Sequence, residues 1–182
     1  MRTLFFFIAI ITITFFSCNS SKSIATQAEI DKLDALIKSK NFTIDSEWAY
    51  PMATVAMQRV SVLLQPGNNP NAINLIGNNN YLTIKGDSIT SYLPYYGERR
   101  MGGGTYGGED SAIQFKGELQ NYKVVQNKDK SYDISFQARS FSENFNVNIR
   151  LFTNLKSNIS LAGNARSQIR YSGTAKAIEK KE

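Results

Sequence analysis

The sequence contains no histidine. A Ser-His-Asp relay, an imidazole metal site and a histidine proton shuttle all need that side chain, so these kinds of site are excluded. Cysteine is almost as scarce, because Cys18 is the only one. It lies at the end of an apolar amino-terminal run, which assigns it to export rather than to thiol catalysis or a zinc site. The catalytic chemistry that remains is that of carboxylates and tyrosines.

Two signatures of nucleotide and nucleic-acid binding are also missing. The glycine-rich stretch 101–108 has no Gly-Lys-Ser/Thr ending and no helical pattern after it, which excludes a P-loop and predicts a flap or crossover. The formal net charge is +6, but the basic residues are scattered rather than gathered on one helix or stripe. We therefore expect a solvated surface and no nucleic-acid partner.

The one long apolar run, residues 4–16, is too short to cross a bilayer and has the length of a signal-peptide core. The four residues that end at Cys18 resemble a bacterial lipoprotein box, although Phe15 stands where that box usually has an aliphatic residue. We predict a signal peptide over 1–17 and a lipidated tether over 18–25, with acyl chains such as palmitate on Cys18. The alternative is an ordinary signal peptide that leaves a free thiol.

Residues 26–178 are predicted to form a single β domain with one amino-terminal helix over 26–40. Thr26 and Glu29 have the spacing of a capping box, and Asn41 suits the end of the helix. The apolar residues of this segment fall on one stripe, which predicts packing against a sheet: Ile30, Leu33, Leu36 and Ile37.

The clearest strand pattern is a hairpin within residues 81–97. Gly86-Asp87 stands between two alternating runs and suits a two-residue type II′ turn. Pro94 ends the second run because it has no N–H to donate. The turn predicts these pairs: Lys85 with Ser88, Ile84 with Ile89, Leu82 with Ser91, and Tyr81 with Tyr92. One face then collects Leu82, Ile84, Ile89 and Leu93.

Further strands are predicted on both sides of this hairpin. Alternation begins at Phe42 and is broken at 48–51, so that 55–64 becomes a second candidate strand and 73–76 a short one. After residue 111 the chain alternates in strand after strand. Three-residue loops at 154–156 and 163–165 are predicted to pair Leu151 with Ile159, Ile149 with Leu161, Leu161 with Ser167, and Ile159 with Ile169. We expect an all-β antiparallel meander with one N-terminal helix, whose curled sheet forms a half-barrel or a sandwich.

Three segments carry a family resemblance: residues 81–97, 112–115 and 166–173, with Leu-Pro-Tyr-Tyr-Gly at 93–97 the most specific piece. They resemble a family of exported gram-negative envelope lipoproteins that is catalogued as domain of unknown function family 4251. The resemblance covers nearly all of the chain after the signal peptide. It implies export and a lipid anchor, placing the protein in the gram-negative cell envelope on the periplasmic or outer-membrane face. It implies no activity.

Five residues beside the glycine-rich stretch form the candidate site: Tyr92, Tyr95, Tyr96, Arg99 and Tyr106. Tyrosine and arginine are favoured at interfaces and at sugar-stacking sites, which predicts a ligand-binding or protein-interaction module. The alternative for these residues is packing at the rim of the sheet. The expected partners are the membrane, through the lipid anchor, and an envelope protein or glycan. No cofactor or metal is expected.

A carboxylate-dependent hydrolase or lyase acting on envelope or extracellular glycans is the alternative function. Glu98, Glu109 and Asp110 lie near the glycine-rich stretch and are its candidate acids. Surface carboxylates that balance nearby arginines explain the same residues. A purely structural envelope protein is the third class.

Overall fold

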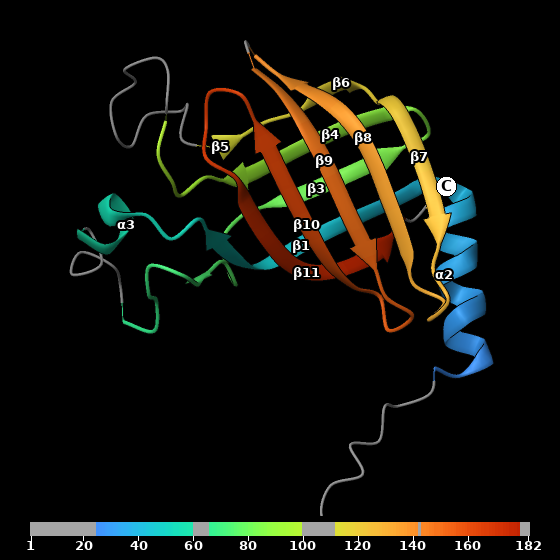
Figure 1. Ribbon diagram of the computed structural model, residues 1–182. Coiled ribbons are helices and arrows are strands. Elements are labelled where there is room, and N and C mark those ends of the chain that lie inside the picture. The colour runs from blue at the N-terminus through green and yellow to red at the C-terminus, as the bar shows by residue number, and fades with distance from the viewer. Residues whose placement is uncertain (1–24, 60–65, 100–111, 142, 179–182) are drawn as a thin grey trace, which may run out of the picture.

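The computed structural model describes residues 25–59, 66–99, 112–141 and 143–178 (Figure 1). The elements in chain order are α2 Gln27–Ser39, β1 Asn41–Pro51, α3 Val55–Arg59, β2 Ile73–Asn74, β3 Tyr81–Lys85, β4 Ser88–Pro94, β5 Ala112–Ile113, β6 Lys116–Glu118, β7 Gln120–Gln126, β8 Tyr132–Ser140, β9 Glu143–Leu151, β10 Lys156–Gly163 and β11 Ile169–Ala177. The predicted all-β fold with one amino-terminal helix is confirmed.

The strands of the described chain form one antiparallel sheet in the order β5-β4-β3-β1-β11-β10-β9-β8-β7, with β2 paired to β1 and β6 to β4. The sheet curls but does not close, because β5 and β7 end this order. Figure 1 shows β8 to β11 crossing in front of β1, β3 and β4, so the two halves of the sheet form two layers. The apolar side chains of every second residue meet between the layers, as period-two burial requires.

The β3–β4 hairpin has the predicted register in all four pairs. Gly86 has φ +61, whereas Asp87 has no positive φ, which is the combination of a type II′ turn. The predicted apolar face is buried, since Leu82, Ile84 and Leu93 have no exposed surface and Ile89 has 1 %. The turn and the hydrophobic pattern therefore specify the same pairing.

Helix α2 begins with the predicted capping box, in which Glu29 N donates to Thr26 Oγ1 and Thr26 N donates to Glu29 Oε2. Its buried stripe is Leu33, Leu36 and Ile37. The predicted stop at Asn41 is wrong by one residue, because Lys40 adopts the left-handed conformation and Asn41 already begins β1. Figure 1 shows the helix beside β7, at one end of the curled sheet.

Strand β1 runs without interruption through 48–51, where a break was predicted. A β-bulge between Ser46 and Trp48 absorbs the irregularity, so Ala49 returns to the buried face opposite Tyr171. Gly173 lies opposite Ser46 at this bulge. A Cβ on Gly173 would overlap the carbonyl oxygen of Asp45 and lie 2.8 Å from Ser46 Cα. The absence of a side chain here lets β1 and β11 approach each other.

The predicted strand over 55–64 is wrong in its described part, because Val55–Arg59 is a short helix, α3. Gln58 N donates to Thr54 O at 3.0 Å, which is a local helical bond rather than a strand pairing. Ala-Met-Gln-Arg is a run of good helix formers, which favours a helical turn here. Residues 60–65 lie outside the described residues. Strand β2 confirms the short strand, over Ile73–Asn74.

The register of the last three strands is offset by two residues from the prediction. Ile159 pairs with Ile149 and with Tyr171, whereas Leu161 pairs with Val147 and Ile169. The first turn is centred on Asn154, because Phe152 N donates to Lys156 O and Leu155 takes φ +62. Because the offset is even, every apolar residue keeps its predicted inner face.

Candidate functional site

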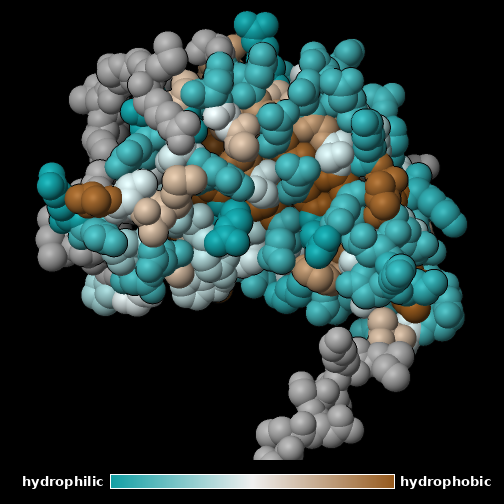
Figure 2. Space-filling view, in the orientation of Figure 1, coloured by the Kyte–Doolittle hydropathy of each residue, from teal (hydrophilic) through white to brown (hydrophobic). Residues whose placement is uncertain are grey.

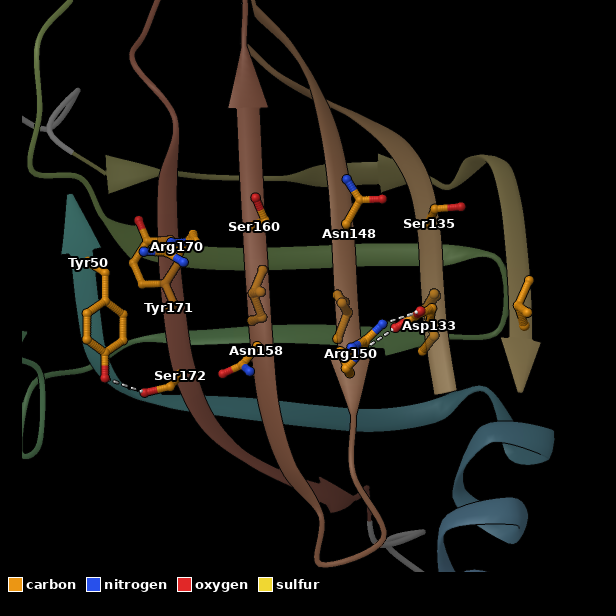
Figure 3. A pocket seen from close by; sticks show the side chains of 14 residues that line it. Tyr50, Asp133, Ser135, Asn148, Arg150, Asn158, Ser160, Arg170, Tyr171 and Ser172 are labelled. Carbon is orange, nitrogen blue, oxygen red and sulfur yellow. Dashed lines mark hydrogen bonds and ion pairs between the residues drawn. The ribbon is translucent and has the colours of Figure 1, made fainter. Parts of the chain in front are cut away.

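The outer face of strands β8 to β11 carries an open groove with a volume of about 690 Å³. Figure 3 shows the side chains that line it: Tyr50 on β1, Arg170 and Ser172 on β11, Asn158 and Ser160 on β10, Asn148 and Arg150 on β9, and Asp133 and Ser135 on β8. All of these are outward positions that alternate with buried ones. The sheet thus presents one polar surface across strands that are far apart in the sequence.

The floor of the groove lies low because the side chains in its middle are short. Cross-strand pairing aligns Arg170, Ser160, Asn148 and Ser135 in one row. Three isoleucines of the buried face also border the groove between these residues: Ile134, Ile149 and Ile159. Only 1 % of each is exposed. Figure 2 accordingly shows hydrophobic residues between hydrophilic ones across the middle of this face.

One end of the groove is formed by Tyr50 and Arg170, which are paired across β1 and β11. The Tyr50 hydroxyl lies 3.2 Å from Ser172 Oγ, which fixes the ring against β11. Arg170 is exposed, and within the described residues its guanidinium makes no hydrogen bond or ion pair. The side-chain amides of Asn148 and Asn158 are likewise uncommitted in the described chain. These donors and acceptors face solvent and are available to a ligand.

The other end of the groove is formed by a bidentate ion pair between Arg150 and Asp133. Arg150 Nε donates to Asp133 Oδ1 at 2.6 Å and Arg150 Nη2 donates to Asp133 Oδ2 at 2.7 Å. The hydrogen bonds from Arg150 lower the pKa of the Asp133 carboxyl, and the same contact raises the pKa of Arg150. Both groups therefore stay charged and neutralise each other. Val125 lies beyond them on β7 and is 59 % exposed.

A second hollow of about 370 Å³ continues the same face along the strands. Side-chain amides line most of it: Gln120, Gln137, Asn144, Asn146 and Asn164. Gln137 Nε2 donates to Asn146 Oδ1 at 3.1 Å, which links β8 to β9 across this hollow. The outward side of β9 is therefore a ladder of three asparagines followed by Arg150. Amide and hydroxyl groups of this kind form hydrogen bonds with sugars.

The structure separates the residues of the predicted tyrosine site from one another. The Tyr95 hydroxyl lies 2.8 Å from Ser167 Oγ and donates to the Glu98 carbonyl at 2.9 Å. The Arg166 guanidinium lies 5.1 Å from the centre of its ring. Burial raises the pKa of Tyr95. This side chain joins the β4 exit to the β10–β11 connection, which is a packing role.

The other predicted residues have different positions. Tyr92 is 38 % exposed on the outer face of β4, opposite Tyr81 and on the layer away from the groove. Tyr96 is half-buried against the core, and burial, followed by the nearby Tyr92, raises its pKa. Arg99 pairs through its backbone with Arg166. Tyr106 lies outside the described residues.

The carboxylates proposed for catalysis are only partly described. Glu98 is exposed, and Glu109 and Asp110 lie outside the described residues. Among the residues that line the groove, Asp133 is the one carboxyl group, and Arg150 holds it ionised. A glycosidase pair needs a protonated acid as well as a carboxylate. The described part of the chain contains no cluster of carboxylates or thiols suited to a metal ion, and none of its helices has the length and apolarity to cross a bilayer.

Sequence reasoning missed the groove residues. The alternation of polar and apolar residues predicted that Asn146, Asn148 and Arg150 face outward. This was the one feature of the sequence that pointed to the groove. It did not show that β8, β10 and β11 would lie beside them with equally short side chains. The match between Tyr50 and Arg170 depends on the bulge in β1, which the sequence did not reveal.

Comparison with known proteins supports this fold. Residues 25–175 match the family described as a domain of unknown function, DUF4251. A crystal structure of a DUF4251 family protein from Bacteroides eggerthii aligns with a TM-score of 0.56 and 12 % identity, covering 82 % of this chain and 88 % of that one. No curated protein matches the sequence significantly. The chain belongs to the DUF4251 family of domains of unknown function.

Proposed function

We propose that this protein is a lipid-anchored module of the gram-negative cell envelope that binds a glycan chain on the outer face of β8 to β11. The observation that carries the proposal is the set of three uncommitted polar side chains among those that line the groove. Arg170, Asn148 and Asn158 make no side-chain hydrogen bond within the described chain, although all three line the groove on three consecutive strands of one sheet. A rigid array of this kind loses little conformational entropy on binding.

The chemistry of the groove suits a sugar better than an apolar ligand or a docked protein. Its polar groups are mostly neutral amides and hydroxyls, which donate to and accept from sugar hydroxyls. Tyr50 presents an aromatic ring at one end, where a sugar ring can stack. The groove continues along the strands into the amide-lined hollow. A chain of several sugar units therefore fits better than a single small molecule.

The substitution Ser160→Phe is expected to weaken glycan binding strongly. Ser160 lies in the middle of the row between Arg170 and Asn148, so a bulky ring there fills the groove. We expect at least a tenfold loss of affinity. The readout is the fluorescence of Trp48, the one tryptophan, which pairs with the groove residue Ser172. The full chain in detergent is titrated with dextran, polygalacturonate and the surface polysaccharide extracted from the producing bacterium.

The matched control is Ser88→Phe, the same change at an exposed serine of β4 on the other layer. It is expected to leave the affinity unchanged. If the wild-type protein binds none of these polysaccharides, or if the two variants weaken binding equally, the groove is not a glycan site.

The anchor is tested separately at Cys18. We expect cells that are fed an alkyne analogue of palmitate to label the wild-type protein and not the Cys18→Ala variant, because the thiol is the group that carries the acyl chain. Ser20→Ala, a change two residues away in the tether, is the control and should retain the label. Equal labelling of all three proteins, or labelling of none, contradicts the lipoprotein assignment.

A further inference from the structure

We infer that the glycan bound in the groove carries carboxylate groups, as in a chain of uronic acids, and that Arg170 binds one of them. This inference rests on the proposed function and specifies its substrate class. It comes from the charges that line the groove and from which of them have a partner within the described chain.

The groove has an unbalanced positive charge. Its lining contains two guanidinium groups, Arg150 and Arg170, and one carboxylate, Asp133. Asp133 accepts two hydrogen bonds from Arg150, at 2.6 and 2.7 Å, so the charge of Arg150 is already neutralised. The charge of Arg170 has no such partner in the described chain. The lining of the groove therefore carries a net charge of +1, and that charge is on Arg170.

The neighbouring cations show that Arg170 differs from them. Lys156 contacts both carboxylate oxygens of Glu47 at 2.9 and 3.2 Å, and Lys176 contacts Asp45 at 2.5 Å. These lysines belong to the same β10–β11 region but lie further along the strands, outside the lining of the groove, and each has its own counter-ion. Arg170 has no counter-ion of this kind in the described chain, so its guanidinium can bind an anion from a ligand.

The surroundings of Arg170 fit a sugar that carries an acid. Tyr50 pairs with it on β1 and Ser160 pairs with it on β10, each one strand, roughly 4.8 Å, away. Figure 3 shows Tyr50 and Arg170 together at the same side of the groove. A guanidinium binds a carboxylate with two parallel hydrogen bonds, while the adjacent ring and hydroxyl contact the rest of the sugar. This arrangement can bind the carboxylate and the sugar ring at the same time.

The test uses three polymers and two variants of the full chain in detergent. Polygalacturonate carries the carboxylate, its fully methyl-esterified form carries the same sugar without charge, and dextran sulfate carries a different anion. We expect wild-type protein to bind polygalacturonate roughly tenfold more tightly than the ester, which is the scale of one charge-assisted contact. Arg170→Gln should abolish most of the difference in affinity between polygalacturonate and the ester. Lys85→Gln, which removes an exposed charge at the end of β3, should change neither affinity.

The outcomes separate this inference from the proposed function. If both galacturonan forms bind equally and Arg170→Gln has no effect, the carboxylate assignment is wrong while the glycan site stands. If dextran sulfate binds more tightly than polygalacturonate, the anion is not a carboxylate. If Lys85→Gln weakens binding as much as Arg170→Gln does, the effect is one of net charge. Failure of all polymers to bind overturns both proposals.

Discussion

Replacing Gly173 with alanine is expected to lower the free energy of unfolding by about 3 kcal/mol, near the upper end of the usual cost of overpacking. The added methyl group would overlap the Asp45 carbonyl and lie 2.8 Å from Ser46 Cα. Both contacts are with backbone in the β1 bulge, which cannot rotate away as a side chain can. The strands β1 and β11 must separate to make room, and they connect the two layers of the sheet.

Thermal unfolding followed by circular dichroism measures this effect. For a chain of this size about 3 kcal/mol corresponds to a fall in Tm of roughly 6–12 °C. Gly117→Ala on β6 is the matched control, because no atom lies within 4 Å of the added Cβ and its φ is not positive. It should shift Tm by no more than a degree or two. A Gly173→Ala protein as stable as the control would show that β1 and β11 are not in close contact at this point.

Replacing Glu143 with leucine is expected to destabilise the fold by about 3–5 kcal/mol, the range for breaking a buried ion pair from one side. The side chains of Glu143 and Arg166 are only 8 % and 11 % exposed, and Arg166 Nε donates to Glu143 Oε2 at 3.0 Å. Glu143 Oε1 also accepts from Ala165 N at 2.9 Å. The substitution leaves the Arg166 charge buried without this counter-ion.

Two comparisons make this prediction specific. The double variant Glu143→Leu with Arg166→Met removes both charges and should recover much of the lost stability. Asp45→Asn breaks a surface pair whose side chains are 48 % and 63 % exposed, so it should cost less than about 1 kcal/mol. Urea unfolding of the set gives the differences. Equal stability of Glu143→Leu and Asp45→Asn would contradict a buried role for Glu143.

Local patterns predicted the parts of the fold that depend on neighbours in the sequence. Gly86-Asp87 specifies its own turn, and the strands on either side agree with it, so the hairpin register was correct. Thr26 and Glu29 are three residues apart, so the capping box was also readable. In the last three strands the inner faces were predicted correctly, whereas the pairing was offset by two. Turn positions such as Leu155 at φ +62 have no strong residue signal.

The candidate site was harder to predict because it depends on contacts between distant segments. The tyrosines at 92–96 are adjacent in sequence, yet Tyr95 turns to Ser167 while Tyr92 faces outward from β4. Conversely, Tyr50 and Arg170 are far apart in sequence and meet across β1 and β11. Their meeting depends on the bulge at Ser46–Trp48, because without it Tyr50 would lie on the other face. No local pattern in the sequence predicts such a contact between distant segments.

The most direct measurement of the central claim is a map of the backbone and side-chain amide signals of the ¹⁵N-labelled full chain, in detergent, as polygalacturonate is added. Binding in the groove predicts the largest shifts at Ser135, Asn148, Ser160 and Arg170, including the side-chain amides of Asn148 and Asn158. Shifts concentrated instead at Tyr81, Thr90 and Tyr92, on the outer face of the opposite layer, would place the ligand on the tyrosines and contradict the groove as the binding surface.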